Sequence, residues 1–179
     1  RRTNYFMHLT ENHAMNSKYP TSLYAGIYSP NVSVIKGAES DKYELLPVAS
    51  KMSFIAVAAL KSPELNMHAH KLPQYHTDSR VIMRGKIRTI LTLAVIGGHD
   101  CPVLSAFGCG AYHNPPNAVA SLFKEVIEND FRGVFKKVVF AIIEDRNSRG
   151  RLNPSGNVKP FEDAFARVEE EEEESTGLQ

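Results

Sequence analysis

The feature that most constrains the fold is a glycine-containing turn that joins a short apolar segment to an amphipathic one. The apolar segment, residues 102–107, is brief and ends at a glycine, which is typical of a buried strand. Beyond the turn, apolar side chains recur at the spacing that places them on one face of a helix: Val119, Leu122, Phe123, Val126 and Ile127. This order predicts a helix N-terminus beside the carboxyl end of a strand.

The turn has the composition of a phosphate-binding loop: Gly108, Cys109, Gly110, Ala111, Tyr112, His113 and Asn114. Its glycines permit positive φ and a close approach of the backbone to a ligand, and a helix N-terminus favours an anion. Tyr112 offers a flat face for a ribose or a base. The prolines at 115 and 116 suit a first helical turn, which Asn114 or Asn117 can cap. An ordinary strand-to-helix turn explains the motif equally well, so both interpretations stay open.

The remaining segments alternate between strand and helix. Extended segments are predicted at residues 24–35, interrupted at Pro30, at 52–60, as a strand covered on both faces, and at 137–143. Helices are predicted from Ser79 to the Gly97-Gly98 pair, from Pro115 to Asn129, and over 160–167. A long connecting loop, residues 63–77, could line a site. The chain has 179 residues, enough for one packed α/β domain.

Composition narrows the class of protein. No apolar run approaches the roughly 20 residues that cross a bilayer, and two cysteines give neither a metal-ligand spacing nor a disulfide framework. An intracellular location, cytoplasmic or nuclear, is therefore expected. Six glutamates, residues 169–174, conceal a basic body, because without them 14 acidic residues face 21 basic ones. We expect a folded unit over residues 1–168 and a disordered acidic tail over 169–179.

Two further clusters are assigned no chemistry. His68 and His70, with His76, could suggest a metal, but no third ligand lies at a convincing spacing. Cys109 at a helix N-terminus could be a nucleophile with His113 nearby, although a small residue that fills a tight turn is the simpler interpretation. No metal and no cofactor are expected.

A row of arginines also invites a functional interpretation. Arg80, Arg84 and Arg88, together with Lys86, lie off the apolar face of the helix expected at residues 79–96. Such a row could touch the phosphates of a polymer, but it is more typical of a solvent-facing stripe. Because no aromatic residues interleave with it, no direct nucleic-acid site is predicted.

Several segments, in this order, resemble the microbial-type poly(ADP-ribose) glycohydrolases of the macrodomain superfamily, in a fungal-like version. They are residues 28–32, the strand that ends at Ala58-Ala59, the helix at 79–96, the turn at 107–114 and residues 138–142. The resemblance implies a three-layer αβα macrodomain with a mixed sheet. It also implies hydrolysis of the ribose–ribose bond of poly(ADP-ribose), so the expected partners are ADP-ribose, its polymer and ADP-ribosylated proteins.

The same resemblance assigns the ligand-binding residues. Gly108 to Tyr112 would hold the diphosphate through backbone N–H groups, with Tyr112 beside the distal ribose and with His113 and Asn114 completing the loop. Asp145 and Asn157, after the last expected strand, are candidate contacts on the nucleotide side.

One departure from the family limits the expected activity. Its Gly-Gly-Gly and Gln-Glu-Glu catalytic motifs are absent, and residues 1–5 resemble the segment that follows them. The domain is therefore expected to be incomplete at its N-terminus and marginally stable, and no catalytic residue is assigned. Three hypotheses remain: the binding part of a glycohydrolase, a non-catalytic ADP-ribose-binding module, or an unrelated nucleotide-binding α/β protein.

Overall fold

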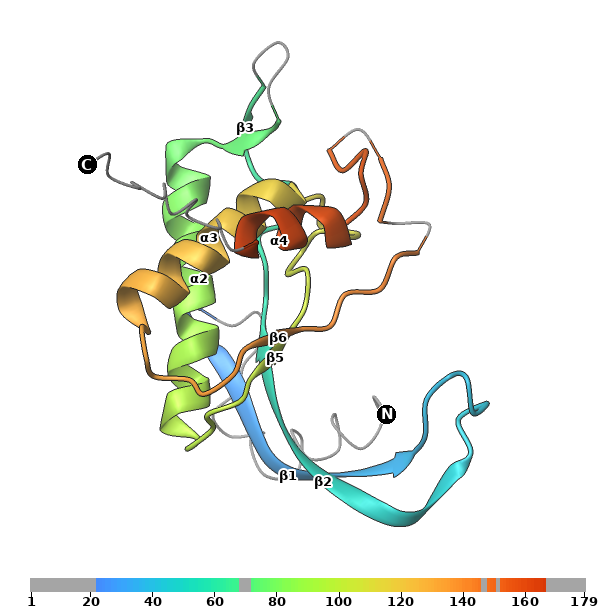
Figure 1. Ribbon diagram of the computed structural model, residues 1–179. Helices are drawn as coiled ribbons and strands as arrows, with labels where there is room; N and C mark the ends of the chain where they lie inside the picture. Colours follow the sequence, from blue (N-terminus) through green and yellow to red (C-terminus); the bar gives the residue numbers. More distant parts are fainter. Residues whose placement is uncertain (1–21, 68–71, 146–147, 151, 167–179) are drawn as a thin grey trace, which may run out of the picture.

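The computed structural model describes residues 22–67, 72–145, 148–150 and 152–166 (Figure 1). Within these ranges the chain has the predicted mixed α/β fold. Its elements are β1 (Gly26–Lys36), β2 (Leu45–Val57), β3 (Leu65–Asn66), β4 (Gln74–Tyr75), α2 (Thr77–Ile96), β5 (Val103–Leu104), α3 (Pro116–Asp130), β6 (Val139–Phe140) and α4 (Val158–Phe165). His68, His70, residues 1–5 and the acidic tail lie outside the described ranges.

The strands pair in both directions. β1 and β2 form an antiparallel ribbon, β3 and β4 a short antiparallel pair, and β5 and β6 a parallel pair in which Val103 is opposite Val139. The parallel pair lies among the helices, whereas the β1–β2 ribbon extends away from them (Figure 1). The glycine turn follows β5, the first strand of the parallel pair.

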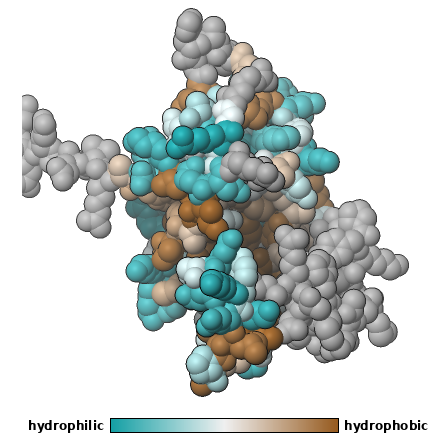
Figure 2. Space-filling view, turned by 90° about the vertical axis from the view of Figure 1, so that its right-hand side faces the viewer, coloured by the Kyte–Doolittle hydropathy of each residue, from teal (hydrophilic) through white to brown (hydrophobic). Residues whose placement is uncertain are grey.

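The β1–β2 ribbon corrects one prediction. The strand predicted at residues 52–60 runs instead from Leu45 to Val57, and it is not covered on both faces, since Met52 is 49% exposed. Within the described residues only β1 pairs with β2. The exposed apolar side chains of the ribbon contribute to the hydrophobic surface at the lower end of the molecule (Figure 2). The predicted interruption near Pro30 is confirmed, because the register shifts there and Asn31 has φ 54°.

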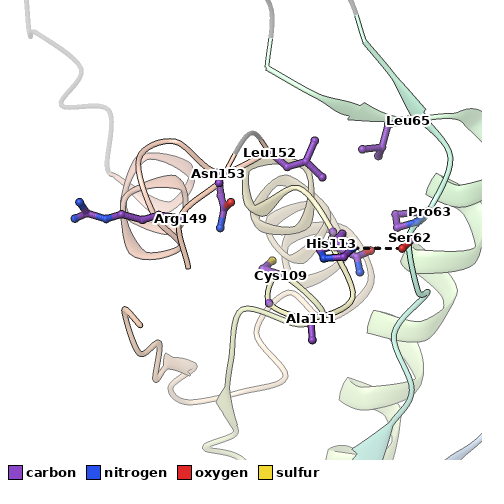
Figure 3. A pocket seen from close by; sticks show the side chains of 12 residues that line it. Ser62, Pro63, Leu65, Cys109, Ala111, His113, Arg149, Leu152 and Asn153 are labelled. Atoms are coloured by element: carbon purple, nitrogen blue, oxygen red, sulfur yellow. Dashed lines mark hydrogen bonds between the residues drawn. The ribbon is translucent and has the colours of Figure 1, made fainter. Parts of the chain in front are cut away.

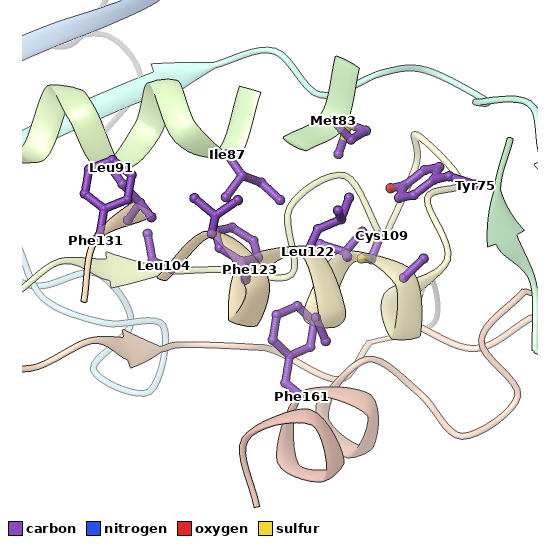
Figure 4. Packing of buried hydrophobic residues seen from close by; sticks show 14 residues of the cluster. Tyr75, Met83, Ile87, Leu91, Leu104, Cys109, Leu122, Phe123, Phe131 and Phe161 are labelled. Atoms are coloured by element: carbon purple, nitrogen blue, oxygen red, sulfur yellow. The ribbon is translucent and has the colours of Figure 1, made fainter. Parts of the chain in front are cut away.

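The hydrophobic core is built by the apolar stripes of α2, α3 and α4 (Figure 4). The helices that the periodicity predicts are all present, with ends within a few residues of the prediction. Their fully buried side chains include Met83, Ile87, Leu91, Val119, Phe123 and Val126. The ring of Phe140 in β6 lies 5.3 Å from that of Phe123 and 5.0 Å from that of Phe161. The parallel strand pair is thereby tied to α3 and α4.

Ion pairs link α2 to α3 and explain the arginine row. The Arg84 guanidinium donates to Glu125 at 2.8 Å and to Asp130 at 3.0 Å, while Arg80 bonds Glu125 and Arg88 lies 3.4 Å from Asp130. The row therefore serves a helix–helix contact as well as facing solvent.

The prediction that Lys86 lies off the apolar face of α2 is wrong. Its side chain is buried, and its ammonium donates to the carbonyl of Leu23 at 2.6 Å. Burial lowers the pKa of this ammonium, because the charged form loses water.

None of the helices in the described ranges has the length and apolar character that crossing a membrane requires.

Candidate functional site

The two glycines of the turn have different structural roles. Gly108 has φ +76°, and a Cβ there would lie 2.5 Å from Nδ2 of Asn114 and 2.7 Å from Cβ of Ala59. Only glycine fits both the conformation and the space. A Cβ on Gly110 would meet no atom within 4 Å. Gly108 therefore shapes the loop, whereas Gly110 leaves room in front of it.

Asn114 is the centre of the loop rather than a helix cap. It is 1% exposed, and its Nδ2 donates to the carbonyls of Leu60 at 2.8 Å, Gly108 at 3.0 Å and Tyr112 at 3.3 Å. Its Oδ1 accepts a hydrogen bond from the Tyr75 hydroxyl at 2.7 Å. The side chain is thus fully engaged within the protein and is not free to contact a ligand.

The prediction that Asn114 or Asn117 caps α3 is wrong, because both side chains are paired elsewhere. Pro115 occupies the N-cap position, and no side chain caps the helix. The Asn117 amide donates instead to the carbonyl of Pro73 at 3.0 Å. The start of α3 depends on its prolines, whose fixed φ and missing N–H suit a first turn.

Burial keeps two acidic groups of the loop region protonated. Burial of Tyr75, with a smaller contribution from Cys109, raises the pKa of the phenol well above its ordinary value, so it remains a hydrogen-bond donor. Burial likewise raises the pKa of the Cys109 thiol to about 12. A neutral, buried thiol is a poor nucleophile, so Cys109 acts as the small residue that fills the turn.

A cavity of about 480 Å³ opens in front of the loop (Figure 3). The segment after β2 forms one wall and a segment before α4 forms another. The lining residues are Ser62, Pro63, Leu65, Cys109, Gly110, Ala111, His113, Asn114, Arg149, Gly150, Leu152 and Asn153. The first wall is fixed to the loop, because the Ser62 N–H donates to the Tyr112 carbonyl at 2.9 Å and Asn114 holds Leu60.

Three successive backbone N–H groups of the loop are unpaired within the described structure. The amides of Cys109, His113 and Asn114 donate to carbonyls of the turn, but those of Gly110, Ala111 and Tyr112 donate to no described group. Among the described lining residues there is no Asp or Glu. Free N–H groups near the N-terminus of α3, without a carboxylate beside them, suit an anionic ligand.

Not every predicted site residue reaches this cavity. Gly108 and Tyr112 belong to the loop but do not line the cavity, and Tyr112 is 42% exposed. Asp145 and Asn157 are also outside it. The Asp145 carboxylate accepts from the Ser148 hydroxyl at 3.1 Å, and the backbone N–H of Asn157 donates to the Glu144 carboxylate at 2.7 Å. Both residues support the segment that carries the far wall.

Sequence reasoning missed most residues of the other two walls. Pro63 and Leu65 lie in the connecting loop that was expected to line a site, but Ser62 precedes it. Arg149, Gly150, Leu152 and Asn153 come from a stretch rich in Asn, Ser, Gly and Pro, and this composition is their one sequence signal. Among the described residues, no three His, Cys, Asp or Glu side chains gather as metal ligands would. His76 lies 3.8 Å from Glu64.

The described part of the chain has a mixed α/β fold similar to that of solved microbial poly(ADP-ribose) glycohydrolases. The enzyme from Thermomonospora curvata is 26% identical, with a TM-score of 0.61 over 78% of this chain and 47% of that one. Two structures of the enzyme from Deinococcus radiodurans in complex with ADP-ribose are also similar. A mutant is 23% identical (TM-score 0.62, covering 79% of this chain and 52% of that one), and another crystal structure is 24% identical (TM-score 0.61, 78% and 51%).

The similarity to these solved structures covers only part of their length. The chain spans about half the length of the glycohydrolases it matches. No family model matches the sequence, and no curated protein matches it. The predicted resemblance to microbial poly(ADP-ribose) glycohydrolases is confirmed at the level of the fold.

Proposed function

We propose that this chain is the ADP-ribose-binding part of a poly(ADP-ribose) glycohydrolase-like protein, with the diphosphate bound in the cavity in front of residues 108–114. The observation that carries the proposal is the row of unpaired N–H groups at Gly110, Ala111 and Tyr112, of which Gly110 and Ala111 line the cavity. It occurs in the fold of a glycohydrolase that was crystallised with ADP-ribose. Backbone N–H groups beside a helix N-terminus bind phosphate through direct hydrogen bonds and the helix dipole.

The walls of the cavity suit the rest of such a ligand. Its volume of about 480 Å³ is within the range of small-molecule sites. Pro63, Leu65 and Leu152 supply apolar surface for a nucleoside, and Ser62 and Asn153 supply polar groups. The described lining has no carboxylate that would repel a diphosphate.

Bond cleavage requires a group that the described cavity does not supply. Hydrolysis of a glycosidic bond uses a carboxylic acid within hydrogen-bond reach of the leaving oxygen. Because no Asp or Glu lines the described cavity, the activity proposed for this chain by itself is binding. Cleavage of the ribose–ribose bond is proposed for a protein that adds such an acid. The proposal extends to the polymer and to ADP-ribosylated proteins as intracellular partners, and to a fungal-like type.

Calorimetry with ADP-ribose, AMP and GTP tests the proposal. We expect ADP-ribose to bind at least about tenfold more tightly than either nucleotide, a difference of about 1.4 kcal/mol. Equal binding of the three ligands would contradict both the glycohydrolase-like protein and the ADP-ribose-binding module. Release of ADP-ribose from labelled polymer by the 179-residue chain would contradict the restriction to binding.

Substitutions at Gly110 test the loop itself. Because the space beside Gly110 is open, Gly110→Gln and Gly110→Glu should both fold. The two side chains are nearly equal in size, so their difference in ADP-ribose affinity isolates the repulsion between a carboxylate and the diphosphate. We expect Gly110→Glu to bind at least about tenfold more weakly than Gly110→Gln. Unchanged affinity in both folded variants would remove the loop from the site.

A further inference from the structure

We infer that His113 is the titratable cation of the diphosphate site, so that ADP-ribose binds more tightly when its imidazole is protonated. This inference rests on the proposed function. It goes beyond the backbone contribution of the loop, because it assigns the side chain of His113 a charge-dependent contact with the ligand and makes affinity a function of pH.

The backbone holds His113 in a defined place on the cavity wall. Its φ is +55°, in the left-handed region, and its N–H donates to the Gly110 carbonyl at 2.9 Å. Its Nδ1 lies 3.4 Å from Oγ of Ser62, which faces it across the mouth of the cavity (Figure 3). Ser62 is itself held by the bond from its N–H to the Tyr112 carbonyl. The imidazole is therefore positioned from two sides.

Of the described ionisable groups around the cavity, His113 is the one placed to contact the diphosphate with a charge that depends on pH. On its own loop, the Cys109 thiol is neutral because burial raises its pKa. On the far wall, the side chain of Arg149 extends away from Cys109 and His113 (Figure 3). On the near wall, Lys61 and Glu64 are not among the lining residues, and the Glu64 carboxylate lies 3.8 Å from the ring of His76.

Protonation changes what the imidazole can offer an anion. With Nδ1 next to the Ser62 hydroxyl, the neutral ring can accept from that hydroxyl and has a single N–H to donate. The protonated ring can donate Nδ1–H to Ser62 and Nε2–H to a phosphate oxygen, which is a charge-assisted hydrogen bond. The diphosphate of ADP-ribose keeps its charge throughout the range in which histidine titrates, so a change of affinity there reports on the protein.

The dissociation constant of ADP-ribose at two pH values tests the inference with the full chain. Between about pH 8 and about pH 5.5 we expect the wild-type affinity to rise about tenfold. Asparagine tolerates positive φ, so His113→Asn should fold; it should bind with the weaker, high-pH affinity at both pH values. His113→Lys should bind tightly at both. Adenosine, which has no charge, should show no such dependence.

His76→Asn is the matched control, because His76 pairs with Glu64 and does not line the cavity. It should keep the wild-type pH dependence, and thermal melts at both pH values check that each protein is folded. A pH-independent wild-type affinity would refute the role of His113 and leave the proposed function intact. A pH dependence that survives in folded His113→Asn would refute it as well. No binding of ADP-ribose at either pH would refute both proposals.

Discussion

Removing the Tyr75 hydroxyl tests whether Asn114 organises the loop. Tyr75→Phe deletes one oxygen and leaves the ring packed, so its main effect is on the 2.7 Å bond to Oδ1 of Asn114. Tyr75 is 5% exposed and Asn114 is 1% exposed, so water has little access to the vacated position. Tyr75 does not line the cavity, so an effect on ligand binding is indirect, and the hydrogen bond that the substitution removes is the one to Asn114.

The expected magnitude follows from the number of partners. Within the described structure, Tyr75 is the only donor to Oδ1 of Asn114. A buried acceptor that loses its partner costs about 1–3 kcal/mol, and we expect a loss of about 2 kcal/mol in the free energy of unfolding. Since a domain has about 5–15 kcal/mol in total, this loss should be easily measured. ADP-ribose affinity should fall too, because the loop carbonyls are then held less firmly.

Urea denaturation of wild type, Tyr75→Phe and Tyr112→Phe provides the assay. Tyr112 is 42% exposed, and no hydrogen bond of its hydroxyl is found within the described structure, so loss of this hydroxyl should change the free energy of unfolding by no more than about 0.5 kcal/mol. If Tyr75→Phe is no more costly than Tyr112→Phe, the argument that Asn114 depends on this bond is refuted. A double-mutant cycle with Asn114→Ala should give a coupling energy of at least about 1 kcal/mol.

Three further predictions concern stability. Gly108→Ala should destabilise the fold by at least about 2 kcal/mol in urea denaturation, because of its φ of +76° and the contact with Asn114, and an unchanged midpoint would contradict this. Because the pKa of Cys109 is raised from 9.0 to about 12, its contribution to stability should be complete below pH 9.0 and lost as the pH rises to about 12, by up to about 1.4 kcal/mol per pH unit. The slope should diminish in Cys109→Ala, and an equal slope would refute this origin. Arg84→Ala, which breaks bonds to two acidic residues, should cost about 1–2 kcal/mol, against about 0.5 kcal/mol or less for the more exposed Arg88→Ala; equal losses would contradict the difference in pairing.

The helices and the loop could be predicted because their signals are local. The stripe that contains Val119, Phe123 and Val126 determines the buried face of α3, and the Gly97-Gly98 pair ends α2 as expected. The placement of glycines between an apolar segment and an amphipathic one likewise predicted the turn between β5 and α3. The burial of Lys86 could not be predicted, because its ammonium is paired with a carbonyl 63 residues away in the chain.

The walls of the site could not be predicted because they depend on contacts between distant segments. Tyr75 and Asn114 are 39 residues apart, and Ser62 and His113 are 51 apart. Neither pair has a sequence spacing that indicates contact. Asn114 is the clearest case: its residue type is typical of a helix cap, yet tertiary contacts place its side chain in a better-paired environment. The same limit explains why the exposure of β2 was not anticipated.

The hydrogen bonds of Asn114 also have a consequence for the thermodynamics of ligand binding. One side chain joins the glycine turn, the carbonyl of Leu60 and β4, so the loop has its shape before a ligand arrives. A ligand that meets preorganised N–H groups loses little free energy to ordering the protein. Binding should therefore leave amide hydrogen exchange in α2 and α3 nearly unchanged, with protection gained mainly at Gly110, Ala111 and Tyr112. The site would work as a rigid receptor whose selectivity lies in its shape.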